Sequence, residues 1–519
     1  MKRTASIALA VLCLAWLVPG LIGHVPWKGG DGAHFARTWL MLHGGGWLTP
    51  GLPGEALPPL YYWTAAATAW VSAPFLALHD GARLASGVYI AVALVFTARA
   101  AHALYGPEHR WPAVLVLIGS VGLLLRGHEM NAFTAQLAGV AMVLDGLARL
   151  ATAQGAGATL VAGLCVMLLA TGLPEPLAIA LGLAFLAATG RVPAARTLLA
   201  AIGVWLAAAA AWAGFLAASG VPVGAVLQVQ RLPGVASLMP GRPLDVLGLL
   251  PWYTWPAWPL AGWALYRSRR DWTEPGVLLP LGVLAVLLLL FVAGHGYGED
   301  KLFAILAPFA LLAARGLLAL KRGAANALLW FSVMLFSFMA LVFWVYWSAH
   351  DLGWPQRLAQ RLVKLRVEDV GRLRVVPLIA GALVTLAWAL FLARLPRTPL
   401  RPILAWSAGM TFVWALLIAL FLDVFDARLG YARVATEIRA AVPAHECVIA
   451  DRVPAQQRVL IGYHSGRALT PRRDADCRWL LVQVRRREAA RPVDARWVRV
   501  LDSARPGDRE DRFRLYVRK

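Results

Sequence analysis

Charged side chains are scarce in this sequence of 519 residues, of which only 15% are Asp, Glu, Lys or Arg. Soluble domains normally carry about 25% charged residues. With 59% hydrophobic residues, the chain also holds more apolar surface than a soluble core can absorb. The low charge therefore excludes an ordinary soluble protein. Apolar runs of roughly 17–25 residues, each long enough to cross a bilayer, recur along most of the chain.

Cysteine is also scarce, with four in the chain and no CxxC motif or other metal-ligand spacing. Cys13 and Cys165 lie inside apolar runs, where a thiol behaves as a small hydrophobe. Cys447 and Cys477 lie in the more polar C-terminal region. We expect these two to form a disulfide if that region faces an oxidising compartment, the alternative being two free thiols.

Acidic residues are outnumbered by basic ones, which gives the chain a formal net charge of +22. A strongly basic chain can bind nucleic acid, but no basic groove with interleaved aromatic residues is visible. The basic residues instead form short clusters between apolar runs, as in membrane proteins, whose orientation such clusters set. The sequence therefore predicts membrane lipids, and no nucleic acid, as partners.

Thirteen apolar runs are predicted to span the membrane as helices. The first follows Met1, Lys2 and Arg3 and lacks a clear signal-peptide cleavage site. We interpret it as an uncleaved span with a cytoplasmic N-terminus rather than as a cleaved signal peptide. The predicted spans are 6–23, 82–104, 112–127, 131–149, 157–172, 175–190, 197–218, 244–266, 276–293, 302–319, 325–347, 374–394 and 403–422.

The basic clusters decide the orientation of these spans. If residues 60–78 form a helix on the membrane surface, four dense basic clusters become cytoplasmic, as the positive-inside rule requires. Residues 348–373 then lie outside although they are basic; their amphipathic pattern predicts a segment on the lipid headgroups. The C-terminal tail also lies outside. The four clusters are Arg191/Arg196, Arg267/Arg269/Arg270, Lys321/Arg322 and Arg394/Arg397/Arg401.

The composition of the chain changes near residue 426. Residues 1–426 are predicted to form an all-α polytopic membrane domain with a large outer first loop at 24–81. Residues 427–519 are predicted to form a small soluble α/β domain. We expect a helix at 434–442 and strands at 447–451, 459–463, 479–483 and 497–501.

Five polar stretches fall on the outer face in this topology, where they would meet at the boundary between membrane and water. In the first loop, Asp31 comes soon after the first span, and the motifs WLTP (47–50) and PPLYYW (58–63) follow it. A second acid, Glu129, comes after the third span. The five stretches are 24–81, 127–131, 173–175, 219–243 and 294–301.

This order of motifs resembles the GT-C fold glycosyltransferases that use lipid-linked sugars, typified by bacterial aminoarabinose transferase and the protein O-mannosyltransferases. The stretch KLFAILAPFALLA at 301–313 is similar to a later segment of that family. The resemblance implies an enzyme of the bacterial inner membrane with a periplasmic C-terminal domain. It implies transfer of a sugar from a polyprenyl-phosphate donor to a lipid, glycan or protein acceptor.

The resemblance also implies roles for individual residues. Asp31 is expected to be the general base or to orient the acceptor, with Glu129 as the second acid. Lys301, Arg231 and Arg242 are expected to hold the donor phosphate. The transfer is expected to be inverting and to need no cofactor or metal, although some relatives with an Asp pair bind a divalent cation. The other expected substrate-binding residues are His34, Arg37, Tyr61, Arg126, His128, Glu175 and Tyr297.

The sequence departs from the family at three places. Gly32 stands where the family usually has a second acid, Leu57 where it often has Lys, and Gly172 opens a turn that often contains Lys. A catalytically inactive relative is therefore one alternative. A transporter or flippase is another, although ionisable residues are scarce in the middle of the spans, where ion-coupled transporters place them.

Overall fold

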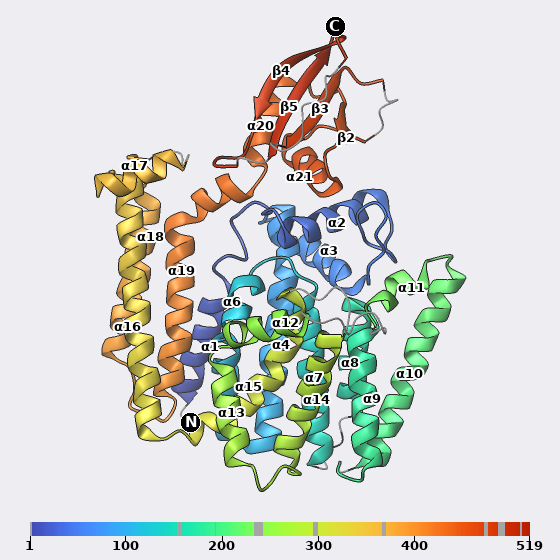
Figure 1. Cartoon of the computed structure of the whole chain (residues 1–519), viewed down its shortest axis with the longest axis vertical. Coiled ribbons are helices and arrows are strands. Elements are labelled where there is room, and N and C mark those ends of the chain that lie inside the picture. The colour runs from blue at the N-terminus through green and yellow to red at the C-terminus, as the bar shows by residue number, and fades with distance from the viewer. Residues whose placement is uncertain are drawn as a thin grey trace.

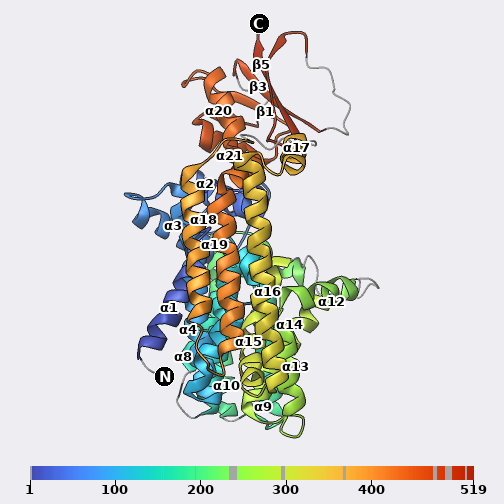
Figure 2. The same ribbon diagram turned by 90° about the vertical axis from the view of Figure 1, so that its left-hand side faces the viewer.

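The computed structural model describes residues 3–152, 155, 157–192, 194–232, 242–293, 299–365, 370–471, 476–485, 494–508 and 511–519. Its helices stand side by side in a bundle, and a small domain with a β-sheet lies at one end of the bundle (Figure 1). Figure 2 shows the same arrangement from the side. The largest cluster of buried apolar residues runs from the bundle into this small domain, where it includes Leu460 and Phe513.

Most of the predicted spans are single helices. Among the described residues, seven helices are long and apolar enough to cross a membrane: α4 (Leu78–Tyr105), α7 (Phe133–Ala151), α10 (Ala195–Ala218), α14 (Pro275–Ala293), α16 (Arg322–Trp347), α18 (Val375–Ala393) and α19 (Arg401–Leu429). Four shorter apolar helices occupy other predicted spans: α1 (Arg3–Leu17), α8 (Gly157–Thr171), α9 (Pro174–Ala188) and α15 (Phe303–Leu318).

Two predicted spans are each broken into two helices, so the prediction of continuous helices there was wrong. The third span consists of α5 (Arg110–Ile118) and α6 (Val121–Gly127), and the eighth of α12 (Arg242–Tyr253) and α13 (Ala257–Arg267). Non-helical backbone at membrane depth is tolerated where protein groups satisfy its hydrogen bonds. At the first break Trp406 Nε1 donates to Gly119 O at 2.7 Å, and at the second Trp255 O accepts from Val121 N at 3.2 Å.

The large first loop contains two helices, α2 (Gly30–Gly44) and α3 (Leu60–Ser72). At 1.5 Å per residue, the 13 residues of α3 reach only about 20 Å, less than the hydrocarbon thickness of roughly 30 Å. The shorter helices in predicted spans, such as α8 and α9 with 15 residues each, are only slightly longer, so the surface placement of 60–78 stays a prediction. Both α2 and α3 lie at the end of the bundle that carries the C-terminal domain (Figure 1).

The C-terminal domain combines two helices with a five-stranded sheet in the order β2-β1-β3-β5-β4. Strands β1, β2 and β3 pair in parallel, whereas β5 pairs antiparallel with β3 and β4. The disulfide Cys447–Cys477 joins the residue before β1 to the residues before β3, with a Cα–Cα distance of 5.3 Å. The elements are α20 (Ala432–Ala441), β1 (Val448–Asp451), α21 (Ala455–Ser465), β2 (Leu469–Thr470), β3 (Trp479–Arg485), β4 (Trp497–Ser503) and β5 (Asp511–Arg518).

The predicted strand at 459–463 was wrong, because these residues belong to the helix α21. Two parallel neighbours need a crossover connection, which is usually a helix. Since β1 pairs in parallel with β2, the segment between them must carry the chain from the end of β1 back to the edge of the sheet where β1 begins. A short apolar run cannot by itself distinguish a strand from such a helix.

Candidate functional site

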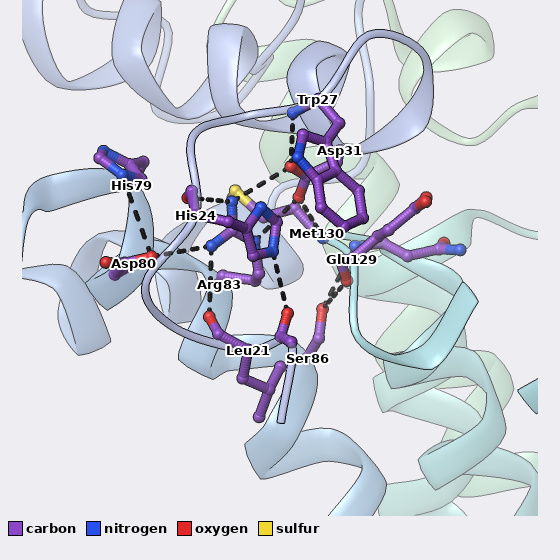
Figure 3. Close-up of polar contacts among 12 residues, drawn as sticks. Leu21, His24, Trp27, Asp31, His79, Asp80, Arg83, Ser86, Glu129 and Met130 are labelled. Atoms are coloured by element: carbon purple, nitrogen blue, oxygen red, sulfur yellow. Dashed lines mark hydrogen bonds and ion pairs between the residues drawn. The ribbon is translucent and has the colours of Figure 1, made fainter. Parts of the chain in front are cut away.

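Asp31 lies in the first turn of α2, not in an irregular loop, and its carboxylate is 1% exposed. Both of its oxygens accept hydrogen bonds from protein groups (Figure 3). Oδ1 accepts from Arg83 Nε at 3.1 Å and from the Met130 amide at 2.8 Å. Oδ2 accepts from Arg83 Nη2 at 3.1 Å and from the Trp27 amide at 3.0 Å. The carboxylate therefore joins three segments that are distant in sequence.

Arg83, in the second turn of α4, is fully buried and uses all five of its N–H donors. Besides Asp31, its partners are the carboxylate of Asp80, at 2.9 Å, and the main-chain oxygens of Leu21 and His24. A buried charge is tolerated only when it is paired and hydrogen-bonded in this way. The Asp31–Arg83 pair thus fixes the chain after α1 against the start of α4.

Asp31 is ionised throughout the physiological pH range. Burial alone would raise the pKa of its carboxyl group, but the neighbouring Arg83 guanidinium and the Met130 amide lower that pKa to about 2. A carboxylate with so low a pKa, and with every oxygen already accepting hydrogen bonds, is a poor acceptor for a substrate proton.

The turn between α6 and α7 is held in place through its main chain. Ser86 Oγ donates to Glu129 O at 2.8 Å, the Met130 amide donates to Asp31, and the Asn131 amide donates to the Tyr61 hydroxyl at 2.8 Å. The Tyr61 hydroxyl also lies 2.8 Å from Ser86 Oγ. Three successive residues are therefore pinned to α2, α3 and α4, and the Glu129 side chain projects from this rigid turn.

Glu129 differs from Asp31 in being accessible, since 18% of its side chain is exposed. Its Oε2 forms an ion pair with Arg126 Nη1 at 3.2 Å. The same oxygen lies 3.7 Å from the position that a Cβ would take on Gly30, so Glu129 borders the first turn of α2. Lys301 is partly exposed in the short η4 helix (Glu299–Leu302), directly before α15.

Three predicted substrate-binding residues near α2 have protein partners. His34 Nδ1 lies 2.9 Å from the Tyr62 hydroxyl, and burial followed by the charge of Arg37 lowers the pKa of His34 to about 3, so its ring is neutral. Arg37 forms a bidentate ion pair with Glu55 at 2.9 and 3.1 Å. Tyr61 is fully buried beneath the pinned turn. Each of them shapes the first loop.

His128 is enclosed rather than presented to a substrate. It is 2% exposed, and its ring packs against Trp16 and Trp414 at centroid distances of 4.5 and 4.8 Å. Its Nε2 lies 2.7 Å from the main-chain oxygen of Trp16 and its Nδ1 lies 3.1 Å from that of Leu124. His128 therefore ties the α6–α7 turn to α1 and α19.

Glu175 and Arg231 form a second buried ion pair at the same end of the bundle. The guanidinium contacts both carboxylate oxygens at 3.1 Å and also donates to Thr171 O. Glu175 is fully buried and Arg231 is 6% exposed, so neither presents an open face to a substrate. The Arg242 side chain and the whole of Tyr297 lie outside the described residues.

The C-terminal domain packs directly on α2. Gln456 Nε2 donates to Gly29 O at 3.0 Å, and the Tyr463 hydroxyl lies 2.9 Å from His79 Nδ1. A Cβ on Gly32 would lie 2.5 Å from Trp27 O and 2.9 Å from the side chain of Leu460. Position 32 therefore has no room for the second acid that the similar family usually has there.

No group of three or more His, Cys, Asp or Glu side chains gathers as metal ligands within the described residues. Arg83 and Asp80 are the central residues that the sequence analysis missed. One signal could have found them: ionisable residues at the start of a long apolar helix are costly there and normally point to a partner or a function.

Comparison with known proteins identifies the fold. No protein-family model and no curated protein matches the sequence. The crystal structure of ArnT from Cupriavidus metallidurans bound to undecaprenyl phosphate is similar with a TM-score of 0.68 at 17% identity, over 99% of this chain and 98% of that chain. This chain has the fold of ArnT. The apo state of ArnT is similar with a TM-score of 0.65 at 16% identity, over 90% of this chain and 85% of that chain.

The likeness to ArnT confirms the GT-C architecture that the motif order predicted. Because it covers nearly all of both chains, it includes the bundle, the helices of the first loop and the C-terminal domain. The chain is a membrane protein of this fold.

Proposed function

We propose that this chain is a membrane glycosyltransferase that moves a sugar from a polyprenyl-phosphate donor to an acceptor, with Glu129 as its general base. The observation that carries the proposal is the presentation of Glu129. An accessible carboxylate stands beside a cation on a turn whose main chain is fixed by three hydrogen bonds. The ArnT fold supports the choice of donor, since that relative is bound to undecaprenyl phosphate.

Glu129 replaces Asp31 as the proposed base because Asp31 already uses both oxygens within the protein. Asp31 is instead a positioning residue, which holds the Met130 amide and thereby the turn that carries Glu129. General bases must lie within hydrogen-bond reach of the proton they accept, and a fixed main chain keeps the carboxylate at one place.

The proposed reaction is a single inverting displacement. The acceptor oxygen forms a bond to the anomeric carbon while the bond from that carbon to the donor phosphate breaks. Glu129 takes the proton of the acceptor hydroxyl, and polyprenyl phosphate leaves as an anion. Cationic groups stabilise charge that develops on a leaving phosphate, and Arg126 and Lys301 are the cations we assign to it. Metal independence stays a prediction.

The reaction is proposed to occur on the membrane face that carries the C-terminal domain, which we take to be the periplasmic face of the bacterial inner membrane. The basic connections at the other end of the bundle support this orientation. They follow α13 and α18 and precede α16, far from the sheet in Figure 1. The acceptor is a lipid, glycan or protein reached from that side.

The experiment is transfer by the purified full chain in proteoliposomes. Radiolabelled undecaprenyl-phosphate aminoarabinose and mannose would be the donors, and total membrane lipids and periplasmic proteins the acceptors. We expect a labelled product with the parent chain and a loss of about 100-fold or more with Glu129→Gln, since a general base contributes roughly 10²–10⁴. Glu55→Gln, on an exposed residue of the first loop, should keep full activity.

Two outcomes would contradict the proposal. If the Glu129→Gln variant transferred sugar at the full rate, Glu129 would not be the general base. Movement of the labelled lipid across the bilayer without any new glycosidic product, in the parent chain, would instead favour a flippase.

A further inference from the structure

The segment between α16 and α18 contains a short amphipathic helix, α17 (Gln356–Lys364), that lies across the ends of these two helices (Figures 1 and 2). α16 and α18 are apolar and expose most of their surface, as expected of helices in contact with lipid. Their ends next to α17 therefore mark one boundary of the hydrocarbon layer, on the side of the C-terminal domain.

The protein holds this segment in place at both ends. Asp351, in the π-helical turn that continues α16, is buried and accepts hydrogen bonds from Arg374 Nη2 at 2.7 Å and from the Arg374 amide at 3.2 Å. Arg374 also contacts Asp423 of α19 at 3.3 Å. Just beyond α17, Leu365 O accepts from Arg428 Nη2 at 3.2 Å. These contacts hold the segment that contains α17 in a fixed position relative to α18 and α19.

The basic side chains of α17 point to a ligand outside the described protein groups. Arg357, Arg361 and Lys364 are exposed, and within the described part of the chain their side chains form no ion pair or hydrogen bond. Their spacing of four and three residues places them on one side of the helix, while Ala359 is buried against the protein. Elsewhere in the C-terminal half of the chain many arginines are paired with acids, as Arg374 is.

Large apolar side chains are exposed at the same level. Leu352 is 55% exposed, Trp354 68% and Val363 58%. Tryptophan is favoured where apolar chains meet lipid headgroups, and long cationic side chains favour the same layer. We call these residues, with the three cations, the α17 surface: Leu352, Trp354, Arg357, Arg361, Val363 and Lys364.

The cations of the α17 surface lie on the side of the membrane where the positive-inside rule predicts few. They therefore do not serve orientation, which the clusters at the opposite end of the bundle already determine. Basic residues close to a bilayer surface attract anionic lipids, and an amphipathic helix inserts its apolar side chains between them.

We propose that the α17 surface docks on anionic lipid headgroups of the leaflet on the C-terminal-domain side, with Arg357, Arg361 and Lys364 binding their phosphates. The partner is a lipid surface rather than an acidic protein, because exposed Trp354 and Val363 accompany the cations at the end of lipid-facing helices. This binding is independent of sugar transfer.

The test is lipid retention by the purified full chain, measured by native mass spectrometry after exposure to equimolar phosphatidylglycerol and phosphatidylcholine. We expect the parent chain to retain more phosphatidylglycerol. The variant Arg357→Gln/Arg361→Gln/Lys364→Gln should lose at least half of that preference. The matched control Arg433→Gln/Arg496→Gln/Arg518→Gln removes three exposed charges from the C-terminal domain and should retain the preference.

Equal retention by the parent chain and the α17 variant would overturn the proposal, as would an equal loss in the control. A second measurement uses the variant Val363→Cys with a spin label, in a chain whose Cys13 and Cys165 are replaced by Ala. In vesicles of phosphatidylcholine with 30% phosphatidylglycerol, the label should be shielded from a water-soluble nickel reagent. Full accessibility of the label in these vesicles would also overturn the proposal.

Discussion

Two buried arginine–carboxylate pairs lie at the same end of the bundle, and they differ in what else they hold. The Asp31–Arg83 pair also binds the amides of Trp27 and Met130, the carboxylate of Asp80 and two main-chain oxygens. The Glu175–Arg231 pair joins the start of α9 to the short η2 helix (Val229–Arg231), with Thr171 O as a further acceptor.

This difference indicates that Asp31–Arg83 positions the turn that carries Glu129, whereas Glu175–Arg231 stabilises only its own surroundings. The contacts of Asp31–Arg83 lie in three segments, namely the chain between α1 and α2, the start of α4 and the α6–α7 turn, so removal of one partner should move the turn that presents Glu129. The contacts of Glu175–Arg231 stay within one corner of the bundle, between α8, α9 and η2. Burial alone therefore says little about function, because the second pair is as buried as the first.

The largest effect is expected from Arg83→Met, which leaves Asp31 and Asp80 buried without their cation. Breaking a buried ion pair by removing one partner costs about 3–5 kcal/mol, because an uncompensated charge remains. We expect a lower unfolding midpoint and loss of transfer in proteoliposomes. Arg37→Met removes an ion pair in the same region whose side chains are 15% and 38% exposed, and it should cost about 1 kcal/mol.

Addition of Asp31→Asn to Arg83→Met sharpens this prediction, since it removes one of the two stranded charges. Part of the lost stability should return, while transfer stays low because the Met130 amide has lost its ionised acceptor. An unfolding midpoint for Arg83→Met within experimental error of the parent would show that the two acids find other partners.

The membrane spans could be predicted because the length and composition of an apolar run are local properties. Their interruptions could not, since the break after α5 depends on Trp406, which reaches Gly119 from a helix almost 300 residues later. Asp31 could be found as a candidate from its place after the first span. Its role could not, because Arg83 lies 52 residues away in an apolar run.

The C-terminal domain shows the same limit. Its strands at 447–451, 479–483 and 497–501 were predicted within a residue or two, but α21 was read as a strand. That helix is defined by its crossover between parallel strands and by its packing on α2, and neither is local. The absence of a side chain at Gly32 is explained in part by Leu460 of the docked helix, which would lie 2.9 Å from a Cβ there, in addition to the local Trp27 O at 2.5 Å.

A smaller effect is expected from Glu175→Gln. Glutamine keeps one acceptor for Arg231 but leaves its buried charge without a carboxylate, so stability should fall by about 2–3 kcal/mol. Transfer per folded molecule should stay within about threefold of the parent, since no substrate contact is removed. If transfer became tenfold slower while the unfolding midpoint stayed unchanged, Glu175 would have to contact the substrate, as the sequence predicted. Glu55→Gln is the matched control with an exposed carboxylate.

The smallest effect is expected from Tyr463→Phe, which tests whether the C-terminal domain acts on the Asp31–Arg83 pair. The substitution removes the hydrogen bond to His79 and keeps the ring contacts with Phe35 and Trp39. His79 precedes Asp80, whose carboxylate binds Arg83. One hydrogen bond contributes about 0.5–1.5 kcal/mol to stability, so the unfolding midpoint should fall only slightly. The weaker hold on the start of α4 should slow transfer by roughly threefold.

A double-mutant cycle with Asp80→Asn tests whether Tyr463→Phe lowers the transfer rate through Asp80. If Tyr463 acts through Asp80 and Arg83, the double variant should be little slower than Asp80→Asn alone, because coupled residues give non-additive effects. Tyr516→Phe removes a hydroxyl from β5 of the same domain and should transfer at the parent rate. The alternative is that the fold-decreases in transfer rate of Tyr463→Phe and Asp80→Asn multiply in the double variant. The C-terminal domain would then support α2 directly, through Gln456 and Leu460, and not through the buried pair.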